Sequence, residues 1–449
     1  MKNSLDRAAH VVKRWFLNLY PIQQVVLGYL SYIILGWFFL LLPWSQKVKN
    51  MSWLDHLFTA TSAVSTTGLA TMSIADSYTF FGQGIVLFLI QLGGLGYMTL
   101  SSFIVLSASG KISSFRHRIT STALSLPQGF EVIRFLRQVI GFTLIIEIIG
   151  TWGLYFIFVK EDVPQALWEA IFHSVSAFCT AGFSLFNTSL EAYRNHVGLN
   201  CLIIVLSYLG AIGFIVMSDV WTSLKYRKTH ITLTSKIILM STLWISVIGT
   251  LLLFFDESST RSLPFFQRAM TAFFQTMTAS TTVGFNTIPI GALTASSLFL
   301  LTLIMIIGAS PAGTGGGLKT TTFTALWAVM ASTFRQQEKI TFFKKQIPRA
   351  RIFSAIASLM FYLFTFIAGV YALTLTEKLP LPDLAFEAAS ALGTVGLSRG
   401  ITGNLTNLGK IIITALMFLG RIGPISIGMA LFTTREKISD FATEEDIAI

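Results

Sequence analysis

Four short stretches of this chain repeat one pattern of threonine and glycine in the same register. In each stretch a threonine stands two residues before a glycine, an alanine five before, a serine or threonine six before and a phenylalanine ten before. The glycines are Gly68, Gly182, Gly284 and Gly396. Repetition at a fixed frame indicates repeated structural units that meet at one target.

The chemistry that this pattern supports is cation binding by backbone carbonyls. Glycine permits dihedrals that turn its carbonyl to one side, with no side chain in the way. Rings of carbonyls from four such stretches can replace the hydration shell of a monovalent cation. Ring carboxylates, which divalent ions and protons call for, are absent from the frames, so we expect a large monovalent cation. The predicted filter residues are Thr66, Thr67, Gly68, Thr180, Ala181, Gly182, Thr282, Val283, Gly284, Thr394, Val395 and Gly396.

Each predicted filter stretch follows an apolar segment that is too short and too rich in Ser and Thr to cross a membrane. We predict a re-entrant half-helix there, with an extended return. Asp55, Glu169 and Asp383 stand thirteen residues before their glycines, where a carboxylate complements a helix N-terminus. The other end of each half-helix then points unpaired carbonyls, worth about half a negative charge, at the cation. The residues after the glycines, such as Leu69 and Phe183, are predicted to pack behind the loop.

Composition places these half-helices in a membrane. The 449-residue chain is 53% apolar and only 12% charged, unlike a soluble domain. Stretches long enough to span about 30 Å of hydrocarbon lie at 24–45, 83–106, 136–159, 197–221, 234–255, 296–330, 352–376 and 407–432. We therefore predict an all-α polytopic membrane protein with eight transmembrane helices and four re-entrant pore helices, arranged as a pseudo-fourfold single-chain ion pore.

The basic residues predict the orientation. Most of the 32 Lys and Arg residues fall in the termini and in the connections around 107–137, 223–236 and 331–351. By the positive-inside rule both termini are cytoplasmic, which also accounts for the net charge of +11 without nucleic acid. The predicted segments are a cytoplasmic N-terminal segment at 1–23, pore repeats at 24–108, 109–222, 223–333 and 334–433, and a cytoplasmic tail at 434–449.

The second span of each repeat carries a glycine cluster at a similar offset. Three clusters are short and are compatible with tight helix contacts. The third cannot sustain a helix, and a broken helix at membrane depth lines a cavity or is buried in protein. We predict a flexible gate below the filter, with a static kink as the alternative. The predicted gate residues are Gly308, Ser310, Pro311, Gly313, Thr314, Gly315, Gly316, Gly317, Lys319 and Arg421.

Charges inside the spans need partners. A lone arginine costs about 3 kcal/mol on insertion scales, so Arg421 is expected to bind the carbonyls of residues 310–317 or to face a water-filled cavity. Glu147 is expected to pair with another helix, and the sequence does not identify its partner. The two cysteines, Cys179 and Cys201, have neither disulfide nor metal-ligand spacing, and Cys179 is expected to be a core residue.

On these motifs the chain resembles the Trk/Ktr/HKT superfamily of potassium transporters, and within it the bacterial Ktr-type membrane subunit. The resemblance implies that Gly68, Gly182, Gly284 and Gly396 line the filter, that residues 308–319 form the intramembrane gate and that Arg421 faces it. It also implies a homodimer in the bacterial plasma membrane, resting on a cytosolic nucleotide-binding regulatory subunit. Potassium would be the transported substrate, with sodium as a coupling or activating ion and no cofactor on this chain.

Three alternatives are weighed against potassium uptake. Each filter stretch has one glycine where potassium channels have two, and only the fourth reads Thr-Val-Gly, so a sodium-selective or weakly selective cation channel remains open. Gly68 favours potassium, because a serine there accompanies sodium transport in plant members of the superfamily. A rocking secondary transporter calls for inverted repeats and charged ligands. An enzyme calls for a catalytic cluster, and the six histidines are scattered.

Overall fold

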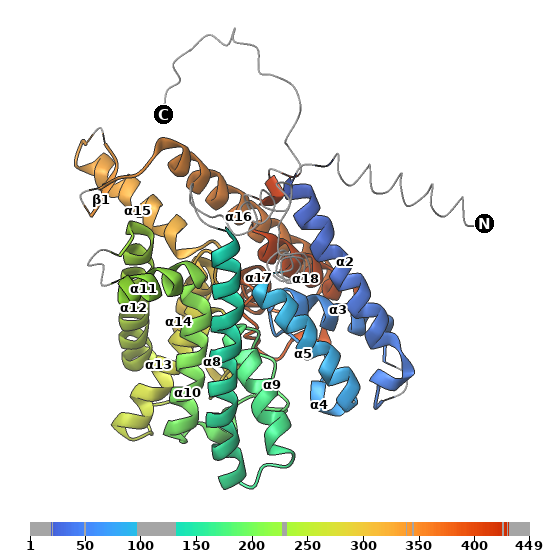
Figure 1. The fold of residues 1–449 in the computed structure, drawn as a ribbon. Helices are drawn as coiled ribbons and strands as arrows, with labels where there is room; N and C mark the ends of the chain where they lie inside the picture. The colour runs from blue at the N-terminus through green and yellow to red at the C-terminus, as the bar shows by residue number, and fades with distance from the viewer. Residues whose placement is uncertain are drawn as a thin grey trace.

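The structure is a computed structural model that describes residues 19, 21–48, 51–96, 132–226, 231–337, 339–343, 345–423, 426–428 and 430. The predicted tail at 434–449, most of the segment at 1–23 and the connection through 107–131 lie outside these residues. Within the described residues the regular elements are helices, as predicted, apart from one short hairpin that was not predicted, β1 (Thr341–Phe342) and β2 (Lys345–Gln346). Figure 1 shows the helices gathered into one bundle, with α15 and α16 across its upper end.

The helices follow the same order in each predicted repeat: a long helix, a short helix, a return and a second helix. The first repeat has α2 (Pro21–Leu41), η1 (Pro43–Ser45), α3 (Trp53–Val64), α4 (Ile74–Ser77) and α5 (Phe80–Leu95). The second has α8 (Val132–Lys160), α9 (Ala166–Phe178), η2 (Glu191–Tyr193), α10 (Val197–Ile212) and α11 (Phe214–Tyr226). The third has α12 (Leu233–Asp256), α13 (Phe265–Thr281), η3 (Ile290–Ala292), α14 (Ala295–Ile307) and α15 (Thr320–Phe334). The fourth has α16 (Arg349–Thr376), α17 (Leu381–Gly393), η4 (Thr402–Asn404) and α18 (Asn407–Ile422).

The four long helices α2, α8, α12 and α16 are long and apolar enough to cross a membrane. Only 22–28% of their most apolar stretches is buried within the chain. Their outward faces carry large apolar side chains, including Phe38, Trp152, Trp244 and Phe364, which are at least half exposed. Such faces suit a hydrocarbon solvent, so these helices form the lipid-facing rim.

The second helix is shorter than predicted in the first, second and fourth repeats, and in the third it breaks at the glycine run, as predicted. The helices α5, α10, α14 and α18 end at Gly96, Gly213, Gly308 and Gly423, whose φ angles are 76°, 94°, 69° and 89°. Positive φ is natural for glycine and ends a helix at its C′ position. The expectation of a continuous second helix in three repeats is therefore wrong for the second repeat, where α11 turns by 94° from α10. Residues 97–106 of the first repeat's predicted span lie outside the described residues.

The repeats close into a ring. The second helix of each repeat packs against the short helix of the next, so that α5 contacts α9, α10 contacts α13 and α14 contacts α17. The last second helix, α18, packs against α3 of the first repeat. This arrangement surrounds one axis with the four short helices.

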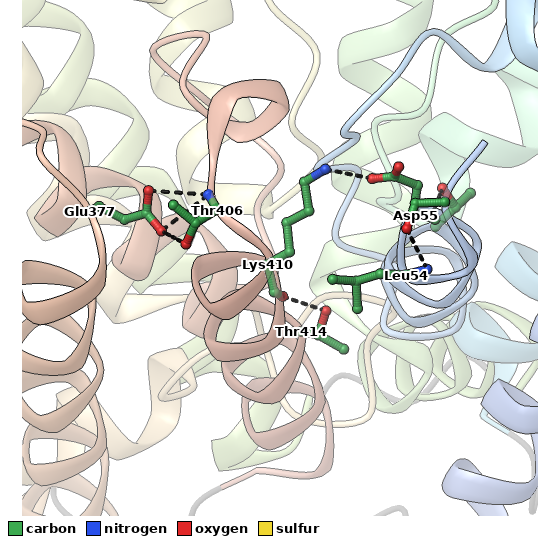
Figure 2. Close-up of polar contacts among 8 residues, drawn as sticks. Leu54, Asp55, Glu377, Thr406, Lys410 and Thr414 are labelled. Carbon is green, nitrogen blue, oxygen red and sulfur yellow. Dashed lines mark hydrogen bonds and ion pairs between the residues drawn. The ribbon is translucent and has the colours of Figure 1, made fainter. Parts of the chain in front are cut away.

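In the third and fourth repeats, a carboxylate fastens the end of the long helix to the start of the second helix. The carboxylate of Glu377 accepts hydrogen bonds from the backbone and the hydroxyl of Thr406, as Figure 2 shows. In the third repeat Glu257 accepts equivalent bonds from Thr294. Because Thr294 and Thr406 also cap their helices, each carboxylate fixes where a second helix begins.

Candidate functional site

The four short helices lie where the half-helices were predicted, and each ends at an unusual threonine. Thr66, Thr180, Thr282 and Thr394 have φ angles of 52°, 50°, 59° and 51°. A β-branched residue in the left-handed region is strained by about 1–3 kcal/mol, and such strain clusters at functional sites. The same strain at four equivalent positions indicates a geometry that the surrounding structure enforces.

One backbone hydrogen bond, repeated four times, turns the chain after this threonine. The amide of the residue before each glycine donates to the carbonyl of the Ser or Thr six positions before that glycine. The distances for Thr67–Ser62, Ala181–Ser176, Val283–Thr278 and Val395–Ser390 are 2.8, 2.8, 3.1 and 2.8 Å. The amides of Gly68 and Gly396 also donate to the hydroxyls of Ser62 and Ser390, at 3.1 and 3.0 Å. The repeated frame thus binds the amide groups and leaves the carbonyls available to a ligand.

The four glycines form a closed cycle of near contacts. All have positive φ: 90° at Gly68, 63° at Gly182, 85° at Gly284 and 97° at Gly396. A Cβ atom on any of them would overlap the carbonyl oxygen of the residue before the next glycine, in the order Gly68–Ala181, Gly182–Val283, Gly284–Val395 and Gly396–Thr67. Only glycine fits, because both the dihedral and the space exclude a side chain. The structure therefore brings the four sequence-predicted stretches together around one axis.

The packing behind this cycle agrees with the sequence. Phe58, Phe172, Phe274 and Phe386, ten residues before the glycines, are at most 1% exposed. The residues after the glycines, Leu69, Phe183, Phe285 and Leu397, are at most 2% exposed. Both sets pack in the core, as predicted for supporting residues.

A cavity of about 310 Å³ opens on one side of the cycle and is lined by all four glycines. Its wall also contains polar residues of the returns, among them Ser184, Asn187 and Asn286. The side-chain amide of Asn187 donates to Asp76 at 2.8 Å, and that of Asn286 donates to Glu191 at 2.7 Å. These bonds join the returns of neighbouring repeats, so the mouth of the cavity is held by contacts between repeats.

The predicted gate segment lies directly against the other side of the cycle. The hydroxyl of Thr314 is 3.0 Å from that of Thr180 and donates to the carbonyl of Phe178 at 3.1 Å. The carbonyl of Thr314 accepts from the hydroxyl of Thr66 at 3.2 Å. Gly315 and Gly316 leave no room for a Cβ beside Thr282 and Thr394. The segment between α14 and α15 therefore contacts the strained threonine of every repeat.

Arg421, at the end of α18, holds this segment in place. Its guanidinium donates to the hydroxyl of Thr66 at 2.8 Å and to the carbonyls of Thr314 and Gly93. The prediction that Arg421 binds carbonyls of residues 310–317 is confirmed at Thr314. Lys319 also bonds within the segment, with Nζ donating to the carbonyl of Gly315 at 2.7 Å.

Two acidic residues near the short helices, Glu147 and Asp55, have polar partners on other helices. Glu147 on α8 accepts from Gln91 at 3.2 Å and lies 3.7 Å from Sγ of Cys179, so its partners are α5 and the end of α9. Cys179 is fully buried, as expected of a core residue. Near the start of α3, Lys410 of α18 is 2.7 Å from Asp55, and Figure 2 shows this link between the last and first repeats.

Sequence reasoning missed one set of polar residues. Nine residues before each glycine stand Thr59, His173, Gln275 and Glu387, all at most 1% exposed. Glu387 is a carboxylate inside the fourth frame, a residue that the prediction of frames without ring carboxylates did not consider. Because the four residue types differ, only their shared polarity could have revealed this position.

Comparison with known proteins agrees with this geometry. A family model of cation transport proteins, TrkH, matches residues 31–440. The chain belongs to this family.

Two relatives of the TrkH family match nearly the whole chain. The chain is 35% identical over 421 residues to Ktr system potassium uptake protein B of Bacillus subtilis, covering 93% of this chain and 94% of that protein. It is 33% identical over 428 residues to potassium/sodium uptake protein NtpJ of Enterococcus hirae, with the same coverage of both. The crystal structure of the potassium transporter TrkH from Vibrio parahaemolyticus has the same fold, with a TM-score of 0.73, 20% identity and coverage of 92% of this chain and 86% of that one.

These matches confirm the resemblance drawn from the repeated frame. The relatives are transport proteins and not enzymes. Together with the apolar rim, they describe a multi-pass membrane protein with a helical, TrkH-like fold.

Proposed function

We propose that this chain carries potassium ions into the cell through one pore formed by its four repeats. The observation that carries the proposal is the closed cycle of Gly68, Gly182, Gly284 and Gly396, in which a backbone carbonyl of each next repeat approaches the glycine with no side chain between them. Neutral carbonyls suit a large, weakly hydrated monovalent cation. The names of the Ktr and TrkH relatives support potassium as that cation.

In this proposal the chain crosses the membrane eight times and dips in with α3, α9, α13 and α17. The second crossings are completed beyond the glycine breaks, as α11 does after α10 and α15 after α14. The basic connections and both termini are cytoplasmic by the positive-inside rule, so the 310 Å³ cavity is the external mouth of the pore.

The segment from Gly308 to Lys319 is proposed as the gate below the filter. It touches all four strained threonines, and Arg421 ties it to α5 and α18, which supports a role for this segment in closing the inner end of the pore. Within the described residues the buried hydroxyls of Thr282 and Thr394 have no hydrogen-bond partner, which leaves two oxygens for a cation that leaves the filter.

The Ktr resemblance further suggests a homodimer, a cytosolic nucleotide-binding regulatory subunit that moves the gate, and sodium as a coupling or activating ion. A sodium-selective or weakly selective channel is the second candidate. The relative named as a potassium/sodium uptake protein favours it, as does the single Thr-Val-Gly sequence among four stretches.

Growth at low potassium tests the proposal. A bacterial strain without potassium uptake should regain growth at low external potassium when it produces this chain with its regulatory subunit. Absent growth with verified membrane insertion of the chain contradicts potassium uptake. Uptake of sodium as fast as or faster than that of potassium in the same cells would favour the second candidate.

A further inference from the structure

The missed polar position, nine residues before each candidate-filter glycine, joins the short helix to the return beyond the glycine. In the second repeat Nε2 of His173 lies 2.9 Å from the hydroxyl of Ser184. In the third, the amide of Gln275 donates to the hydroxyl of Thr287 at 3.3 Å. Ser184 and Thr287 follow their glycines by two and three residues. Each of these hydrogen bonds therefore closes a loop around a filter stretch.

The first repeat makes the connection with a tyrosine. Tyr78 lies after the return, hydrogen-bonds to Thr59 and is 3.0 Å from Nδ1 of His56. Tyr78 is fully buried. Three repeats thus fasten the far side of the filter stretch to the short helix, whereas the first repeat ties its short helix to Tyr78, just before α5.

The fourth repeat has the strongest version of this connection. Glu387 is fully buried, and its carboxylate accepts from the hydroxyl of Ser398 at 2.9 Å and from the hydroxyl of Thr402. The hydroxyl of Ser398 in turn accepts from the amide of Gly400 at 3.0 Å. One side chain therefore holds two positions of the return, where His173 and Gln275 each hold one.

This carboxylate needs a reason to be buried. Among the described residues Glu387 forms no ion pair, and hydroxyl groups are its hydrogen-bond donors. A carboxylate is costly to bury, and its hydrogen bonds are stronger and shorter than those of a neutral group. The carboxylate of Glu387 loses its hydration on burial, and in return its hydrogen bonds hold the return rigidly beside Gly396.

We propose that Glu387 is a positioning residue that fixes the fourth filter stretch and so sets how strongly the pore discriminates between potassium and sodium. On the helix side of the glycine, the amides of Val395 and Gly396 are already held by Ser390. On the far side Ser398, two residues after Gly396, is held by Glu387. Without that bond the return can shift and change the spacing of the carbonyls. The inference rests on the proposed function.

Three substitutions test it in liposomes, with the ratio of potassium flux to sodium flux as the readout. Glu387→Gln keeps the shape, and both hydroxyls can rotate to satisfy an amide, so its flux ratio should stay within about twofold of the unsubstituted protein. Glu387→Leu removes both bonds to the return, and its ratio should fall by about tenfold or more. Glu377→Leu is the matched control, because this carboxylate also binds a threonine in the same repeat but at the start of α18 and not beside Gly396. Its flux ratio should not change.

The ratio is independent of the amount of folded protein, which separates positioning from a loss of yield. If Glu387→Leu does not fold, Ser398→Ala combined with Thr402→Val removes the same two bonds and should lower the ratio equally. An unchanged ratio in the folded Leu variant or in this double variant overturns the proposal. So does a fall in Glu387→Gln as large as in Glu387→Leu, since the charge would then act rather than the geometry. Absence of potassium flux in the unsubstituted protein would instead refute the proposed function.

Discussion

Replacing Gly68 by serine should weaken discrimination against sodium. Gly68 has a φ of 90°, where a residue with a side chain is strained by about 1–3 kcal/mol. Its Cβ would also overlap the carbonyl oxygen of Ala181, so the first and second stretches must move apart. If the substitution reduces the difference in binding free energy between potassium and sodium by about 1.4 kcal/mol, the selectivity for potassium falls about tenfold.

Two further glycines separate the causes of this effect. Gly84 lies in α5 of the same repeat with open space around it, so Gly84→Ser is a matched substitution that should leave selectivity unchanged. Gly400 has a φ of 85° and no atom within 4 Å of a Cβ position, so Gly400→Ser adds backbone strain without displacing a filter carbonyl. Its effect on selectivity should be smaller than that of Gly68→Ser.

The assay measures rubidium and sodium uptake side by side in cells that contain each variant. The rubidium-to-sodium uptake ratio should fall most in Gly68→Ser, less in Gly400→Ser and not at all in Gly84→Ser. Unaltered selectivity in folded Gly68→Ser would refute the assignment of Gly68 to the filter. A fall of equal size in Gly84→Ser would show that the assay responds to general damage.

Three more predictions follow from the gate and the core. Arg421→Met removes hydrogen bonds that hold the gate segment; if the closed conformation loses about 2 kcal/mol of stability, ion flux should rise up to about thirtyfold. The control Arg399→Met, which breaks the ion pair with Asp383, should not raise the flux. A lower flux in Arg421→Met contradicts the closing role. Deleting residues 312–316 should also raise flux, and lower flux with intact folding would favour a static kink. Phe172→Ala should destabilise the protein by about 3–5 kcal/mol, seen as a lower unfolding temperature, because the ring is fully buried; an unchanged temperature would show that the site collapses without cost.

Much of the helical architecture could be predicted from the sequence. The long helices could be located from apolar stretches, because a helix that crosses the lipid must be long and apolar. The repeated frame located the short helices that follow. The glycines at the cycle were identifiable because close carbonyl approach and positive φ both require glycine. These are constraints that one residue type satisfies, so a single sequence displays them.

Features that depend on partners distant in the chain could not be predicted. The partners of Glu147 are Gln91 and Cys179, which only the packing of α5, α8 and α9 brings together. The break between α10 and α11 at Gly213 could not be predicted, because a glycine at this position is equally compatible with a tight contact in a continuous helix. The position of Glu387 was hidden because hydrogen bonding can be supplied by Thr, His, Gln or Glu, so its four versions share no residue type.

Ion flux into liposomes with potassium or sodium as the sole cation tests the central claim most directly. The purified chain with its regulatory subunit should pass potassium faster than sodium, and Gly68→Ser should narrow the difference. Equal flux of both ions would contradict a potassium-selective pore. Flux of neither ion from folded protein would contradict the pore itself.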